Sequence, residues 1–242
     1  MLQIFSKEFS SFLNSLIAYV VIGVFLLAMG LLMWVFPETS VLEYGYADMS
    51  TVFSLGPYVL IFLIPAITMR SFAEEKKGGT MELLFTKPLT DWDIILGKFL
   101  ASLALVLLAL LPTLVYYYSL YTLGNPKGNI DTPGIIGSYI GMAMLAAAFS
   151  AIGVMASSIS ANQIVAFILA AFLCYLTFAA FDALSGLAAW GPRALAIKQL
   201  GILFHYESMS RGLIDSRDLV YFASLIFLVL SLTKLILSSR QW

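Results

Sequence analysis

The side chains that could do chemistry are concentrated in one stretch, residues 70–98, which reads RSFAEEKKGGTMELLFTKPLTDWDIILGK. Its final Gly97-Lys98 pair is followed by Phe99, so the G-x-x-x-x-G-K-[ST] loop that cradles nucleotide phosphates is absent. His205 is the only histidine in the chain, which excludes a site built from several histidines. We therefore predict no catalytic residue, no cofactor and no metal, and we interpret the stretch as a contact surface for another protein.

The composition indicates that the protein lies in a lipid bilayer. Of the 242 residues, 61% are hydrophobic and 11% are charged, whereas an average soluble domain has about 25% charged residues. A water-soluble fold cannot bury that much apolar surface, so the bilayer must be the solvent. No basic stripe with interleaved aromatic residues is present, which argues against nucleic acid as a partner. The single cysteine, Cys174, excludes an internal disulfide.

Long uncharged runs predict an all-α integral membrane protein with six transmembrane helices in a single transmembrane domain, residues 1–242. About 20 apolar residues in a helix cross the hydrocarbon layer. Residues 1–16 have apolar side chains at helical spacing and are expected to lie in the headgroup region as an amphipathic helix. The alternative is that these residues simply begin the first span. The spans are expected at about 17–36, 49–69, 99–121, 135–156, 163–182 and 219–237.

The distribution of Lys and Arg predicts which loops face the cytoplasm. Five cations occur in residues 70–98 and none in residues 37–48, so we place residues 70–98 and both chain termini in the cytoplasm and residues 37–48 on the opposite side. Residues 183–217 then form an external segment, although four cations in that segment count against the placement. Within it, residues 194–204 are apolar enough to enter the interface as one short helix.

The predicted spans contain few groups that could bind an ion. Inside the first five there is no Asp, Glu, Lys, Arg or His, and Asp182 lies at the end of the fifth. Ion-coupled carriers usually need ionisable groups in the membrane, so this absence argues against that class, without excluding Na⁺ bound by carbonyls and hydroxyls. The fourth span is rich in Gly and Ala, which allows close helix packing. We favour packing within the chain, and a dimer face is the alternative.

The charged stretch also contains start and stop signals for two helices. After a glycine pair, Thr80 is a good N-cap for one apolar turn over residues 81–85, and Pro88 ends that turn. Thr90 and Asp93 have the spacing of a capping box, which predicts the start of the helix that leads into the third span. A short capped apolar helix held between two spans is suited to a hydrophobic groove of a partner.

The same stretch resembles the loop after the second span in type-2 ABC exporter permeases. Their common pattern is an Arg, an acidic and basic cluster, Gly-Thr-x-Glu-Leu-Leu, a Pro, an acidic residue and Gly-Lys. The segment FSKEFSSFLNSLIAY at 5–19 resembles the amphipathic entry helix of that family, and SISANQIVA at 158–166 resembles its inner hairpin. The loop residues that match are Arg70, Glu74, Glu75, Gly79, Thr80, Glu82, Leu83, Leu84, Pro88, Asp93, Gly97 and Lys98.

A narrower resemblance concerns the tail at 204–222, FHYESMSRGLIDSRDLVYF. It is similar to the gliding-motility-associated permease subunit (Gld F type) of Bacteroidota, and other permeases of the superfamily share versions of it. The resemblance implies a permease subunit in a bacterial inner membrane that couples ATP hydrolysis by a partner to transport or envelope work, here in gliding motility. The chain itself is then not an enzyme. The alternatives are an ion-coupled carrier or channel, and a non-transporting membrane scaffold for an envelope machine.

The resemblance also implies the partners and the place of contact. The partners are two copies of a cytoplasmic ABC ATPase subunit, a second permease subunit or a second copy of this chain, and membrane lipid. A coupling helix between the second and third spans is expected to seat in the ATPase, with the surrounding charges setting its register. The residues assigned to this coupling are Glu74, Glu75, Lys76, Lys77, Gly79, Thr80, Glu82, Leu83, Leu84, Phe85, Pro88 and Asp93.

Overall fold

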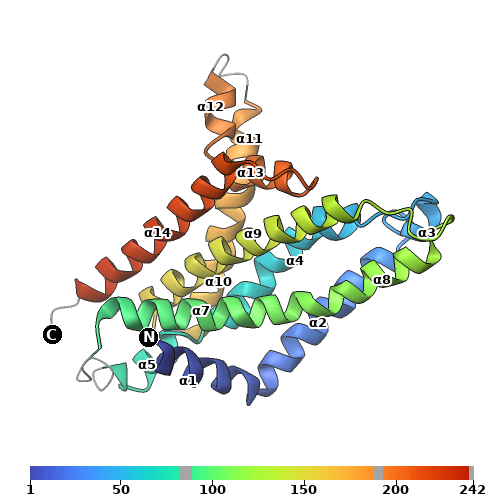
Figure 1. Ribbon diagram of the computed structural model, residues 1–242. Helices are drawn as coiled ribbons and strands as arrows, with labels where there is room; N and C mark the ends of the chain where they lie inside the picture. The colour runs from blue at the N-terminus through green and yellow to red at the C-terminus, as the bar shows by residue number, and fades with distance from the viewer. Residues whose placement is uncertain (82–88, 188–192, 240–242) are drawn as a thin grey trace.

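The computed structural model describes residues 1–81, 89–187 and 193–239, and every regular element in those ranges is a helix (Figure 1). Six helical stretches there are long and apolar enough to cross a membrane, so the predicted all-α fold with six transmembrane helices is confirmed. These stretches are Leu16–Trp34, Ser50–Lys77, Asp91–Leu123, Thr132–Ile159, Gln163–Ser185 and Ser216–Ser238. The predicted coupling helix over 81–85 lies, apart from Met81, outside the described residues.

The helices differ greatly in length. Short helices connect the long ones or extend them at their ends (Figure 1). The elements are α1 (Leu2–Leu13), α2 (Leu16–Trp34), α3 (Val41–Tyr44), α4 (Ser50–Thr68), α5 (Ala73–Lys77), α7 (Asp91–Leu110), η1 (Leu111–Thr113), α8 (Leu114–Leu123), α9 (Thr132–Ile159), α10 (Gln163–Tyr175), η2 (Leu176–Ala180), α11 (Phe181–Ser185), α12 (Ala194–Lys198), α13 (Ile202–Met209) and α14 (Ser216–Ser238).

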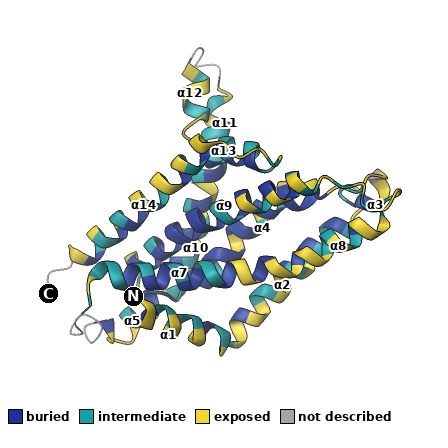
Figure 2. Ribbon diagram, viewed as in Figure 1, coloured by how far each residue is buried: buried dark blue, intermediate teal, exposed yellow. Residues whose placement is uncertain are grey.

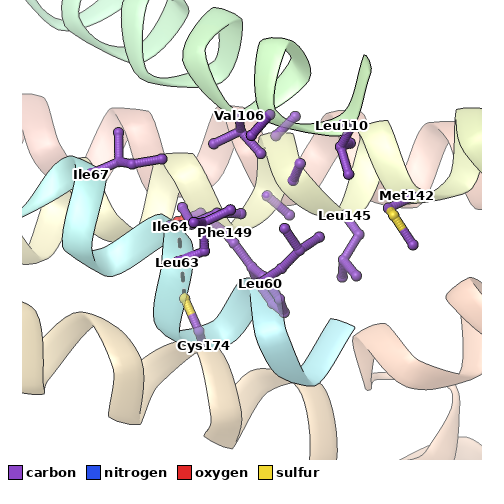
Figure 3. Close-up of a cluster of buried hydrophobic side chains, with 14 of the residues drawn as sticks. Leu60, Leu63, Ile64, Ile67, Val106, Leu110, Met142, Leu145, Phe149 and Cys174 are labelled. Atoms are coloured by element: carbon purple, nitrogen blue, oxygen red, sulfur yellow. Dashed lines mark hydrogen bonds between the residues drawn. The ribbon is translucent and has the colours of Figure 1, made fainter. Parts of the chain in front are cut away.

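Helix α9 forms the centre of the bundle. It packs against α4, α7, α10, α13 and α14, and most of its length is buried (Figure 2). Its small residues allow this: a Cβ added at Gly153 would overlap the side chain of Thr68 on α4. The small residues of α9 therefore serve packing within the chain, as favoured above. Larger side chains fill the space beside them, among them Leu60, Ile64, Val106, Leu145 and Phe149 (Figure 3).

The N-terminal residues form a helix of their own. Helix α1 ends at Leu13, and the side chain of Ser15 then accepts a hydrogen bond from the backbone N–H of Ile17 at 3.3 Å. This N-cap starts α2 as a separate element. Residues 2–13 therefore do not continue the helix of the first span, and their location in the headgroup region stays a prediction. In Figure 1, α1 lies beside the beginning of α7 instead of continuing the axis of α2.

Three of the long helices contain a local irregularity. Helix α4 contains Pro57 and Pro65, which have no backbone N–H to donate, and yet it stays helical through both. The third span passes through the 3₁₀ turn η1, which contains Pro112, and the fifth passes through the π-helical turn η2. A π-turn shifts the helical register by inserting an extra residue, so the side chains beyond it point in new directions.

The segment before the last span differs from its prediction. Residues 194–204 do not form one helix, because Gly201 has an extended backbone conformation that separates α12 from α13. Helix α12 has no buried residue, whereas α13 buries Ile202, Tyr206 and Met209. The chain thus inserts the second of the two helices into the bundle.

Candidate functional site

Most of the described part of the charged stretch lies at one end of the bundle, where α1, α5 and the first turns of α7 meet (Figure 1). We call this the charged end, and define it by Lys7, Glu8, Arg70, Glu75 and Lys98. It adjoins the C-terminal end of α9. Three segments far apart in the chain are brought together here by tertiary packing.

Lys98 is the centre of the charged end. Its side chain is 1% exposed, and its Nζ lies 3.0 Å from Glu8 Oε1 and 3.0 Å from Glu75 Oε1. The same ammonium donates to the backbone oxygen of Ser71 at 2.6 Å and lies 5.1 Å from the ring centre of Phe72. A buried cation is tolerated only with such partners, because desolvation costs several kcal/mol.

The two carboxylates share a second cation at the surface. Lys7 Nζ lies 3.7 Å from Glu8 Oε1 and 3.6 Å from Glu75 Oε1. The side chains of Glu8 and Glu75 are 15% and 14% exposed, so both are largely removed from water. Glu75 therefore faces the interior of the chain, and its described ionic partners belong to α1 and α7. It joins α5 to both helices.

The first turn of α7 is held by a cap and by the chain terminus. Thr90 Oγ1 accepts from the backbone N–H of Asp93 at 3.2 Å, and the Asp93 carboxylate accepts from the backbone N–H of Thr90 at 3.3 Å. The predicted capping box is confirmed. The terminal amine of Met1 lies 3.2 Å from the same carboxylate. One turn further, a Cβ at Gly97 would come within 2.8 Å of the Ile4 side chain, so α1 and α7 touch closely.

Helix α5 is also fixed to the end of α9. Ser157 Oγ accepts hydrogen bonds from the backbone N–H groups of Phe72 at 2.9 Å and Ala73 at 3.1 Å, and donates to the oxygen of Met69 at 3.0 Å. Lys76 Nζ donates to the backbone oxygen of Ser158. One serine hydroxyl thus satisfies backbone groups at the junction between α4 and α5 that have no partner within a helix.

The remaining predicted site residues lie around this junction. Glu74 is exposed and pairs with Arg70 at 3.0 Å, while Lys77 is exposed in the last turn of α5. Gly79 has a positive φ of 66° and turns the chain away from α5. Thr80 donates from Oγ1 to the backbone oxygen of Glu75 at 3.4 Å. Glu82, Leu83, Leu84, Phe85 and Pro88 lie outside the described residues.

Sequence reasoning did not find the role of α1 in this site. Glu8 was not assigned to the site, and Lys98 was singled out only by resemblance. A helical pattern shows which residues share a face, but not which distant charge meets that face. The one available signal was the charge of Glu8 within an otherwise amphipathic segment.

The sequence of the chain matches a known protein family. The family model described as ABC-2 family transporter protein matches residues 2–191, which include the whole charged end. The chain belongs to this family. It is a multi-pass membrane protein and the membrane component of an ABC transporter, a class of subunit that works with an ABC ATPase. No curated protein matches the chain.

Membership of the ABC-2 family confirms the coarse part of the resemblance, the type-2 permease class. The matched region ends before α12, so α13 and α14 lie outside it. The gliding-motility subgroup, which was based on the tail at 204–222, stays a prediction. Within the described residues, no group of three or more His, Cys, Asp or Glu side chains is placed to hold a metal ion.

Proposed function

We propose that this ABC-2 family protein is the permease subunit of an exporter in a bacterial inner membrane, and that it converts ATP hydrolysis by a cytoplasmic partner into transport or envelope work. Gliding motility is the process that the tail at 204–222 favours. The charged end is cytoplasmic in this proposal, together with both termini. Two ATPase copies and a second permease subunit, or a second copy of this chain, complete the complex.

The observation that carries the proposal is the way in which both ends of the loop at 78–90 are held. The loop leaves α5 and returns to α7, and Glu75 and Lys98, one from each of these helices, meet at 3.0 Å. A force on the loop therefore acts on α7 directly and on α4 through α5. Since a buried ion pair resists separation, the loop acts on a rigid base.

Within the loop we divide the assigned residues into two roles. The apolar group Leu83, Leu84 and Phe85, with Glu82 beside it and Pro88 after it, makes the contact with the ATPase groove. Glu75 and Asp93 position the loop, because their partners belong to this chain. The exposed residues Glu74, Lys77, Gly79 and Thr80, together with Lys76, flank the contact and set its register.

One of the four cations in residues 183–217 is paired with the end of the fifth span. Lys198 Nζ lies 2.9 Å from Asp182 Oδ1. The hydrogen bond and the charge of Asp182 raise the pKa of Lys198 above its usual value, which keeps the lysine charged. The positive-inside rule counts Lys and Arg whether or not they are paired, so the external placement rests on the excess of these residues on the proposed cytoplasmic side.

The test replaces both Leu83 and Leu84 by Asp in a tagged chain that is expressed with its partner ATPase. We expect the ATPase to be lost from the purified complex while the chain still inserts into the membrane, because charged side chains cannot enter an apolar groove. The matched control is Leu213→Asp with Ile214→Asp, an adjacent apolar pair that is exposed in the segment before α14. Equal recovery of the ATPase with the loop variant and with the control would overturn the proposal.

A further inference from the structure

Helix α13 enters the bundle at the end opposite to α5. Its buried residues Ile202, Tyr206 and Met209 follow the spacing of one helical face. This face packs against α9 and η2, while α14 lies alongside. The side chain of Tyr206 reaches another span, since its hydroxyl meets the backbone of α4.

The contact on α4 exists because of a proline. Pro57 has no N–H, so the backbone oxygen of Phe53, four residues earlier, loses the hydrogen bond that a helix would otherwise supply. Tyr206 donates its hydroxyl to that oxygen at 2.6 Å. In a membrane, a carbonyl freed by a proline must find such a donor on a neighbouring element.

Aromatic packing holds the hydroxyl in place. Tyr206 is 2% exposed, and its ring centre lies 6.3 Å from that of Phe178 in the π-turn η2. Phe178 in turn contacts Phe149 of α9 at 6.0 Å and Tyr58 of α4 at 5.6 Å. Burial raises the pKa of Tyr206, so the hydroxyl keeps its proton and remains a donor.

The neighbouring residue ties α13 to the last span. His205 Nδ1 lies 2.7 Å from Asp218 Oδ1 of α14, and Nε2 lies 2.9 Å from the backbone oxygen of Gln199. The imidazole also stacks on Tyr221 of α14 at 3.9 Å. Helix α13 is therefore bonded to α14 through one residue and to α4 through the next.

We infer that Tyr206 is a positioning residue that completes the hydrogen bonding of α4 at Pro57 and makes α13 follow the movement of α4 during the transport cycle. Helices α4 and α5 belong to one long helical stretch, Ser50–Lys77. Displacement of the coupling loop therefore reaches Pro57, and Tyr206 passes it to α13 and on to α14. The inference has two parts. The claim that α13 follows the movement of α4, the functional half, rests on the proposed coupling to an ATPase. The claim that Tyr206 completes the hydrogen bonding of α4, the hydrogen-bond half, does not.

The hydrogen-bond half is tested by a double-mutant cycle on the purified chain. Tyr206→Phe removes only the hydroxyl, and Pro57→Ala gives the Phe53 oxygen an N–H partner within α4. We expect Tyr206→Phe to lower Tm in the wild-type background and to have little effect in the Pro57→Ala background. Equal Tm shifts in both backgrounds would overturn the inference, because the hydroxyl would then act independently of the proline.

The functional half is tested on the complex with its ATPase in lipid nanodiscs. A Ser208→Cys reporter on α13, in a Cys174→Ala background, is labelled with a maleimide without nucleotide and with ATP plus vanadate. We expect vanadate trapping to change the labelling rate in the complex without the Tyr206 substitution. Tyr206→Phe should abolish that change, while the ATPase rate of this variant persists. The conservative control is Tyr221→Phe, which loses a hydroxyl bonded to the Leu200 oxygen at 2.8 Å and should keep the change.

The outcomes separate the two proposals. Retention of the nucleotide-dependent labelling change in Tyr206→Phe overturns the positioning role, as does its absence in the wild-type complex. Failure of the ATPase to bind overturns the proposed function instead, and the Tm cycle still decides whether Tyr206 completes the backbone of α4.

Discussion

At the two ends of the bundle, the helices are held together by different physical means. At the charged end, a buried lysine joins α1, α5 and α7 through carboxylates at 3.0 Å. At the α13 end, a neutral hydroxyl fills a gap in the backbone hydrogen bonding of α4. The charged end therefore depends on complete charge pairing, whereas the α13 end depends on the position of one aromatic ring.

The largest expected effect comes from removing the central cation. Lys98→Met leaves Glu8 and Glu75 buried with only the more distant Lys7 beside them. We expect a loss of about 3–5 kcal/mol of stability, since an uncompensated buried charge is costly. Thermal unfolding of the purified chain in detergent measures it.

A combined variant sharpens this prediction. Lys98→Met together with Glu8→Gln and Glu75→Gln should recover part of the loss, because no unpaired charge remains in the interior. If Lys98→Met alone unfolds at the wild-type temperature, the charged end is not held by charge and the comparison between the two ends fails.

A smaller effect is expected where α5 meets α9. Ser157→Ala removes the acceptor of the Phe72 and Ala73 N–H groups and the donor to the Met69 oxygen. We expect a loss of about 1–3 kcal/mol, the usual cost of leaving buried polar groups unsatisfied. The measurement is the same thermal unfolding.

Helix α9 itself supplies the matched control. Ser150 is equally buried, and its hydroxyl has no hydrogen-bond partner within the described residues. Ser150→Ala should therefore be neutral or slightly stabilising. Equal losses from the two serine variants would show that Ser157 contributes by its volume and not by its hydrogen bonds.

The smallest effect is expected at the exposed ion pair between α11 and α12. The side chains of Lys198 and Asp182 are 33% and 41% exposed, so water screens their attraction. Lys198→Met should change stability by about 0–1 kcal/mol. Because the Lys198 pKa is raised, the pair stabilises the fold at neutral pH and this contribution is lost as the pH rises through that pKa. A loss as large as that of Lys98→Met would remove the distinction between buried and exposed pairs.

Much of the fold could be predicted from local patterns. The uncharged runs located six spans, the spacing of Thr90 and Asp93 located a capping box, and the composition of α9 indicated close packing within the chain. The break between α12 and α13 was missed, because an isolated glycine in an apolar run does not by itself reveal the backbone conformation at Gly201.

The candidate site was only partly within reach of sequence reasoning. Glu75 was assigned to the contact with a partner, whereas in the structure its carboxylate is paired with Lys98 in the interior. From the sequence both roles are equally open to an acidic residue in a charged loop. Only burial distinguishes them, and burial depends on where α1 lies.

The sequence by itself determined the solvent, the number of spans and the family. A bilayer requires apolar helices of a minimum length, which can be counted along the chain. The family motif is likewise recognised from the spacing of residues along the chain. The tertiary structure alone decided which polar groups meet. Glu8 and Lys98 are 90 positions apart, and Phe53 and Tyr206 are 153 apart. No local period relates residues at such separations. Their pairing follows from which helices pack together, and it is enforced by the cost of leaving a charge or a carbonyl unsatisfied away from water.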